Sequence, residues 1–195
     1  MENINFMNDL ELRMYGLVNY QLSGIQQGIQ FSHGLVEYSQ RMKRLGEHKQ
    51  SLAEQYERWA DKWKTVIILN GGTTNDKINM NDGLPKGTLN KHLLSLASAN
   101  IEFSFFHEPD LGDQLTSIVF IVDERVFNKS KYPDFDDWIL INYGDLIKFD
   151  KDLEFEAFKK SPSDEDRKIC EKWIDFVGGE KNVFLRNFLK DFRLA

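Results

Sequence analysis

Cysteine is almost absent from this 195-residue chain, which contains Cys170 and no other. A single thiol cannot form an intrachain disulfide, and it cannot supply a cysteine-rich metal framework. Long apolar runs are absent too, since no stretch approaches the roughly 18 apolar residues of a membrane-spanning helix. The N-terminus lacks the basic start and apolar run of a signal peptide. We therefore expect a soluble protein in a reducing, cytoplasmic setting, with no membrane partner.

Positive charge is also in short supply. The 25 lysines and arginines are outnumbered by 31 acidic residues, which gives a net charge of −6. A protein that coats nucleic acid is normally basic, because its affinity comes from neutralising phosphates. The acidity argues against such a coat and leaves room for a local basic patch. Apolar residues make up 41% of the chain, with fifteen phenylalanines, so a packed core is expected rather than disorder.

The first two thirds of the chain alternate between strand and helix patterns. Strands are predicted over 13–20, 65–72, 101–108 and 115–123, and helices within 21–40 and over 50–63 and 88–99. Residues 73–87 are rich in Asn, Asp and Gly, which predicts a long loop. This β-α-α-β-α-β-β order favours the α/β class, with a four-stranded, mostly parallel sheet and helices on both faces.

The character of the chain changes after residue 125. We expect an α/β domain over 1–125 and a C-terminal extension over 126–195. The extension is predicted to hold an edge strand or hairpin within 138–149 and two helices near 163–177 and 180–193. The last helix carries a wide apolar face, formed by Phe184, Leu185, Phe188, Leu189 and Phe192. That face should pack on its own domain or on a second subunit, so a homo-oligomer is one expectation.

The first helix carries two stripes at helical spacing. Its start is fixed by Ser23 and Gln26, which fit a capping box. One stripe is predicted to pack on the sheet and consists of Ile25, Ile29, Ser32 and Val36. The neighbouring stripe is polar and consists of Gln26, Gln30, His33 and Glu37. It is either a solvated face or part of a site. Gly24, Gly28 and Gly34 weaken the helix, which suggests close approach of a strand, a loop or a ligand.

These residues resemble the type 2 peptidyl-tRNA hydrolase family of archaea and eukaryotes. That family carries G-K-x-A-A-Q-x-S/A-H-A on its first helix. Gln30 and His33 match the Q-x-x-H core, and Gly28 and Gly34 stand at small-residue positions. The family also has a tryptophan before its second strand, as Trp59 stands here before residues 65–69.

The resemblance continues to the last strand of the first domain. Asp110 and Gly112 match the family motif D-A-G-x-T, and Thr116 opens the following strand, as a threonine does in the family. The family lysine on which hydrolysis depends falls on Gln26, and the loop before Thr116 is shorter. The resemblance covers roughly residues 13–123, and it implies the fold more than the reaction.

The resemblance implies a cleft with catalytic candidates His33, Asp110, Gln30 and Thr116. Ligand-binding candidates are Gln26, Gly28, Gly112 and Asn70, the last of which ends a strand before two glycines. A strand that ends in glycines can cradle a phosphate through its backbone N–H groups. Structural roles are open alternatives: His33 can bond a helix carbonyl, and Asp110 can simply form a turn.

Acidic and histidine side chains cluster near the predicted turn after residue 108. His107, Glu108, Asp110 and Asp113 do not follow a known metal-ligand spacing. Such residues in a loop are usually solvated, so neither a metal nor a cofactor is expected.

Two functional classes follow from these observations. One is a hydrolase of peptidyl-tRNA or of a nucleotide. The other, which we favour, is a protein that binds a nucleotide or tRNA-like end with weak or no hydrolysis. An interaction protein is a third class. The Asn- and Phe-rich composition resembles that of accessory proteins of large lytic phages, and this implies an alternative role in sequestering or cleaving a nucleotide signal of host defence.

Overall fold

The computed structural model describes residues 10–45, 50–73, 87–144 and 154–195. The chain divides into two compact units, Met1–Asp123 with Leu189–Ala195 and Glu124–Phe188. The boundary thus follows Asp123 rather than residue 125, and the chain end belongs to the first unit. In the described part of the chain, no helix has the length and apolar character needed to cross a membrane.

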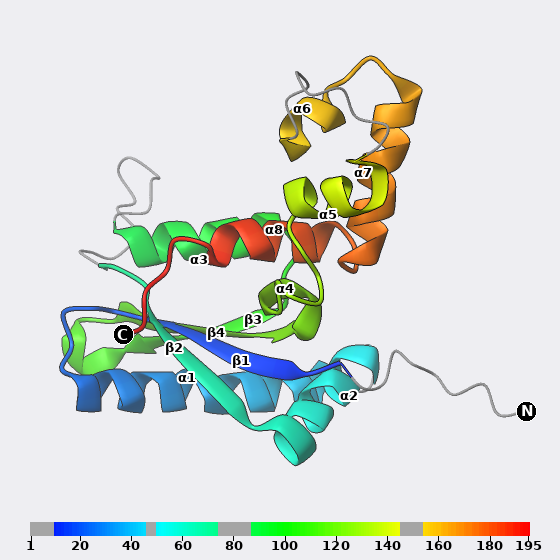
Figure 1. The fold of residues 1–195 in the computed structure, drawn as a ribbon. Helices are drawn as coiled ribbons and strands as arrows, with labels where there is room; N and C mark the ends of the chain where they lie inside the picture. The colour runs from blue at the N-terminus through cyan, green and yellow to red at the C-terminus, as the bar shows by residue number, and fades with distance from the viewer. Residues whose placement is uncertain (1–9, 46–49, 74–86, 145–153) are drawn as a thin grey trace, which may run out of the picture. The chain divides into compact units, whose positions relative to one another are not determined.

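The first unit contains a four-stranded open sheet with strand order β2-β1-β4-β3 (Figure 1). The strands are β1 Leu12–Val18, β2 Thr65–Asn70, β3 Phe103–Glu108 and β4 Gln114–Asp123. The predicted α/β class and strand number are therefore confirmed. The prediction of a mostly parallel sheet is wrong, because β4 runs antiparallel to both β1 and β3, and only β1 and β2 pair in parallel.

The connection between β3 and β4 explains the mixed sheet. It is a single 3₁₀ turn, Pro109–Leu111, followed by Gly112 and Asp113 with φ of 71° and 63°. A parallel pair needs a crossover of a dozen or more residues, so this turn forces antiparallel pairing. β4 then inserts between β1 and β3, and its central place buries every residue from 115 to 122.

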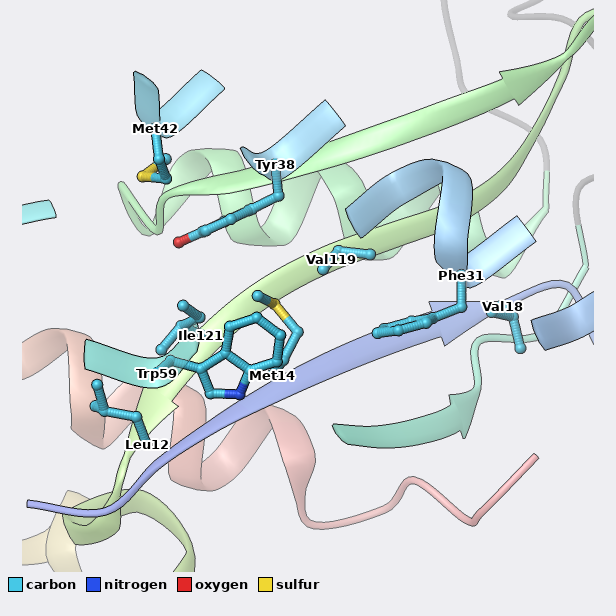
Figure 2. Packing of buried hydrophobic residues seen from close by; sticks show 9 residues of the cluster. All are labelled: Leu12, Met14, Val18, Phe31, Tyr38, Met42, Trp59, Val119 and Ile121. Carbon is cyan, nitrogen blue, oxygen red and sulfur yellow. The ribbon is translucent and has the colours of Figure 1, made fainter. Parts of the chain in front are cut away.

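One face of the sheet is covered by α1 (Gly24–Leu45). Its buried residues include Phe31, Gly34, Tyr38 and Met42. Phe31, Tyr38 and Met42 pack with residues of β1 and β4 and with Trp59 in one apolar cluster (Figure 2). A Cβ added to Gly34 would lie 2.7 Å from the Ser117 and Val119 side chains, so this glycine permits the close approach of helix and sheet.

The predicted sheet-packing stripe of α1 is exposed instead. Ile25, Ile29 and Val36 are 81%, 48% and 57% exposed, and Ser32 is exposed as well. Phe31 lies two residues after Ile29, which places it about 200° around the helix. The helix is therefore rotated so that the aromatic residues and Gly34 meet the sheet.

The second helix follows the prediction with one irregularity. α2 (Gln50–Arg58) continues into a π-helical turn, Trp59–Trp63. Trp59 is buried and its indole N–H donates to the carbonyl of Thr65 at 2.9 Å. Its predicted place in the core is confirmed, and Leu52, Tyr56 and Trp63 pack partly buried against the same cluster.

The other face of the sheet is covered by α3 (Thr88–Ser98), which Figure 1 shows opposite α1. Leu89 and Leu96 of α3 are fully buried. The outer edge of β2 is covered by the chain end, because Leu194 bridges Leu69 and the amide of Ala195 donates to Ile68 at 3.1 Å. These bonds explain why the last residues belong to this unit.

The second unit is helical. Its elements are α4 Glu124–Phe127, α5 Phe135–Tyr143, α6 Phe155–Lys159, α7 Asp164–Phe176 and α8, which spans Glu180–Leu189. Residues 138–143 are thus helical, and the predicted edge strand or hairpin is wrong there; residues 145–149 lie outside the described part. Phe135, Trp138 and Ile139 are buried at i, i+3 and i+4, which is helical spacing.

The two predicted C-terminal helices are present. Ser163 caps α7, and Gly178 and Gly179, with φ of 92° and 100°, end it. α8 ends at Leu189, earlier than the predicted residue 193. Leu185 is buried, and the other members of the predicted apolar face, Phe184, Phe188, Leu189 and Phe192, are half-buried.

Gly16 offers a test of the packing between β1 and α1. A Cβ at Gly16 would lie 2.2 Å from Cδ2 of the buried Phe31 ring. We expect Gly16→Ala to lower the free energy of unfolding by about 1–3 kcal/mol, as overpacking does. Combined with Phe31→Leu, it should lose less than the sum of the single changes. Urea denaturation measures this, with Gly28→Ala as control because its added Cβ meets no atom within 4 Å. A fully stable Gly16→Ala protein would contradict the packing.

Candidate functional site

The candidate residues gather at one end of the sheet. β1, β2 and β3 run in the same direction, so their carboxyl ends lie together, and β4 begins there. Figure 1 shows the start of α1 and the β3–β4 turn at this end. Ligands of open α/β sheets commonly bind outside the carboxyl ends of strands.

Gln30 is the centre of the hydrogen-bond network. It is buried, and its side-chain N–H donates to Glu108 Oε2 at 2.5 Å. Its side-chain oxygen accepts from the Thr116 hydroxyl at 2.6 Å, and its main-chain oxygen accepts from Ser117 Oγ at 2.7 Å. An ionised carboxylate only accepts hydrogen bonds, so the amide orientation of Gln30 is fixed by Glu108.

Thr116 has no exposed surface. Its hydroxyl also lies 3.3 Å from the carbonyl oxygen of Phe106. Since nothing outside the protein reaches this hydroxyl, Thr116 could influence a ligand only through Gln30. Its geometry is that of a positioning residue.

His33 lies one turn along α1 from Gln30. Its side chain is exposed, yet its ring stacks on Phe106, with centroids 4.5 Å apart and planes 20° from parallel. The ring therefore has one face against the protein.

Asp110 belongs to the turn between β3 and β4. It is exposed, and its backbone N–H donates to Glu108 Oε1 at 3.4 Å. Gly112 takes the left-handed conformation and its N–H donates to the Pro109 carbonyl. The imidazole Nδ1 of His107 lies 2.9 Å from the Asp113 carbonyl, which can only accept, so Nδ1 carries the proton. Asp110 and Gly112 are therefore both part of the turn that joins β3 and β4.

Of the remaining ligand-binding candidates, Gln26 and Asn70 bond to residues near them in the chain. Gln26 accepts from Ser23 N–H at 3.0 Å and from Ser23 Oγ at 2.9 Å, so the predicted capping box is confirmed. Added Cβ atoms at Gly24 and Gly28 would meet nothing, so only Gly34 shows the close approach suggested for these glycines. Asn70 accepts from the N–H of Gly72 at 2.9 Å and lies on β2, which β1 separates from β4.

The structure thus joins Gln30 and Thr116 directly, and it links His33 and Asp110 to them through Phe106 and Glu108. The catalytic and binding roles of these residues stay predictions. Sequence reasoning missed the role of Glu108, which it noted only within an acidic cluster. The signal was weak, because Glu108 is 78 residues from its partner Gln30.

Asn19 was missed as well. It follows β1, is buried, and its side-chain oxygen accepts from the Gln21 N–H at 2.9 Å. Its own N–H donates to the Thr116 carbonyl at 3.1 Å, which ties the end of β1 to the start of β4. The signal available in the sequence was a polar residue, Asn19, directly after an apolar strand.

Among the residues that the structure describes, no group of three or more His, Cys, Asp or Glu is placed so that it could hold a metal ion. No protein-family model, no curated protein and no solved structure matches the chain.

Proposed function

We propose that the protein binds a nucleotide or the 3′ end of an RNA at the carboxyl ends of β1 and β3, with weak or no hydrolase activity. In this proposal the first unit is a distant relative of the type 2 peptidyl-tRNA hydrolases. The observation that carries it is the hydrogen bond from Thr116 to Gln30, which are 86 residues apart. This bond joins the helix with the Q-x-x-H motif to the strand that follows the Asp-Leu-Gly turn.

The stacked pair of His33 and Phe106 supports a ligand with a base. One face of the His33 ring is covered by Phe106, and the side chain is exposed. Single-stranded nucleic acids bind largely through stacking of bases on aromatic or histidine rings. A stacked ring beside hydrogen-bonding side chains suits one nucleoside better than a long phosphate backbone.

Weak or absent hydrolysis follows from the residue at position 26. The family's lysine would supply a charge for phosphates or for a developing oxyanion. The Gln26 side chain is neutral and already bonds to Ser23. Ligand binding should therefore depend only weakly on salt, because few counterions are released.

The test is a binding titration with a fluorescent oligoribonucleotide that ends in CCA, together with adenosine monophosphate as competitor. We expect saturable binding that His33→Ala weakens about 5- to 150-fold, the range for loss of one base stack. Gln40→Ala is the matched control, since Gln40 is an exposed residue of the same helix. Equal affinity of the His33→Ala protein would contradict the stacking role.

A second candidate is a protein that only docks a partner. The exposed stripe of Ile25, Ile29 and Val36 favours it, because apolar side chains gathered on one helix face commonly mark contact surfaces. Failure of both probes to bind the intact protein would favour this candidate over the nucleotide-binding proposal.

A further inference from the structure

Glu108 is the acid of the network and is more accessible than Gln30 and Thr116, which are both buried. Glu108 itself is half-buried. One carboxylate oxygen accepts from Gln30 and the other accepts from the backbone of Asp110. A carboxylate offers about four lone-pair sites, so these two bonds leave capacity for hydrogen-bond donors of a ligand.

The position of Glu108 is fixed by three elements. Gln30 on α1 holds Oε2, the amide of Asp110 in the turn holds Oε1, and Thr116 on β4 fixes the amide of Gln30. Such a carboxylate is preorganised, so little side-chain freedom is lost when a ligand binds.

The chemistry of a carboxylate narrows the part of a nucleotide that it can contact. A phosphate would be repelled, and most base edges offer both donors and acceptors. The vicinal hydroxyls of ribose are donors, and acidic residues contact them in dinucleotide-binding folds. The 2′-hydroxyl is also the group by which proteins distinguish RNA from DNA.

The stacked ring lies close enough for one nucleoside to reach both groups. Gln30 and His33 are three residues apart on α1, about 4.5 Å along its axis. Glu108 contacts the first and Phe106 stacks on the second. A base on His33 would therefore place its sugar beside Glu108.

We infer that Glu108 is a specificity-determining residue that accepts hydrogen bonds from the ribose hydroxyls of the bound nucleotide and so selects ribonucleotides over deoxyribonucleotides. This inference rests on the proposed function, because it names the part of the ligand that the site recognises. Gln30 and Thr116 are positioning residues in it.

The experiment compares adenosine monophosphate with its 2′-deoxy and 2′,3′-dideoxy forms by calorimetric titration of the full chain. We expect the ribose form to bind at least tenfold more tightly than the dideoxy form, as for hydrogen bonds to a charged group. Glu108→Gln should bring that ratio close to one and leave dideoxy binding unchanged. Retained dideoxy binding shows in the same titration that the variant is folded.

The matched control is Asp113→Asn, which removes one negative charge from the same turn. Asp113 is exposed and has a φ of 63°, a conformation that asparagine tolerates. It should leave the ribose preference intact. Equal binding of all three probes by the unmodified protein would overturn the inference and leave the proposed function standing. A Glu108→Gln protein that keeps the full ribose preference would likewise overturn the inference and leave the proposed function standing. Failure of all three mononucleotides and of the CCA oligoribonucleotide to bind would overturn both the inference and the proposed function.

Discussion

Replacing Arg186 with methionine is expected to lower the free energy of unfolding of the helical unit by about 1–3 kcal/mol, because it leaves partly buried hydrogen-bond acceptors without their donor. Its guanidinium donates to the carbonyls of Arg125 at 2.5 Å and Tyr132 at 2.8 Å, and to Asp134 Oδ1 at 2.6 Å. The side chain is 1% exposed. Methionine retains much of the apolar volume and removes all three donations.

Hydrogen exchange of the full chain measures this effect locally. Amides of α7 should lose protection in Arg186→Met, whereas those of β1 and β4 should not. Arg167→Met is the matched control, because Arg167 pairs with Asp164 on the surface, where the two side chains are 46% and 83% exposed. Surface pairs contribute only about 0–1 kcal/mol. Equal loss of protection in both variants would show that burial of Arg186 is unimportant.

The charge of Asp134 makes the stability difference between Arg186→Met and the unmodified protein depend on pH. Burial raises the pKa of Asp134, but hydrogen bonds from Lys129 and Arg186 outweigh it, so the pKa lies below its ordinary value. A lowered pKa in the folded state means that the stabilisation is complete above the unfolded pKa and is lost as the pH falls through the folded one. The difference between Arg186→Met and the unmodified protein should therefore shrink below about pH 4.

Gln26→Lys is expected to raise peptidyl-tRNA hydrolysis by up to about 10²- to 10³-fold over the weak or absent activity of the unmodified protein, the range for one well-placed charge. The change places at the start of α1 the lysine that type 2 peptidyl-tRNA hydrolases carry in the motif that this helix resembles. It also removes the side-chain oxygen that accepts from Ser23, and a cation is unfavourable near a helix N-terminus. A small loss of stability should accompany the gain.

The assay follows release of the peptide from labelled peptidyl-tRNA beside a lysine-bearing family member at equal concentration. Gln40→Lys adds the same charge to an exposed position of the same helix, so it separates a placed charge from a general attraction to RNA. Activity of the unmodified protein comparable to the family member would make the hydrolase the better hypothesis. An inactive Gln26→Lys protein that still binds the oligoribonucleotide would show that more than the lysine is missing.

Local chemistry in the sequence was sufficient for the order of elements in the first unit and for several helix ends. The capping box of Ser23 and Gln26 starts α1, and Gly178 and Gly179 end α7, because these signals act within a few residues. Trp59 was placed in the core correctly, since large aromatic residues at helical spacing need burial. Gln30 and His33 could be chosen as site candidates from their spacing on a single helix.

The helix starting at Phe135 was missed for a local reason. The run Trp-Ile-Leu-Ile, from Trp138, fits a buried strand as well as a helix, and short apolar runs do not distinguish the two. The buried positions Phe135, Trp138 and Ile139 have helical spacing, and the first of them lies before the run.

Only the tertiary structure decided which partners meet. The buried face of α1 is the one that carries Gly34, which fits against Ser117 and Val119, whereas the sequence offered Ile25, Ile29 and Val36 as a competing apolar face. The direction of β4 depended on a turn that is too short for a crossover. Gln30 and Thr116 hold Glu108 in position. These two residues lie far from one another along the chain but on elements that meet at the same end of the sheet. Sequence periodicity reports the faces that an element offers, whereas contacts between distant segments depend on how those faces pack, and the candidate site consists of such contacts.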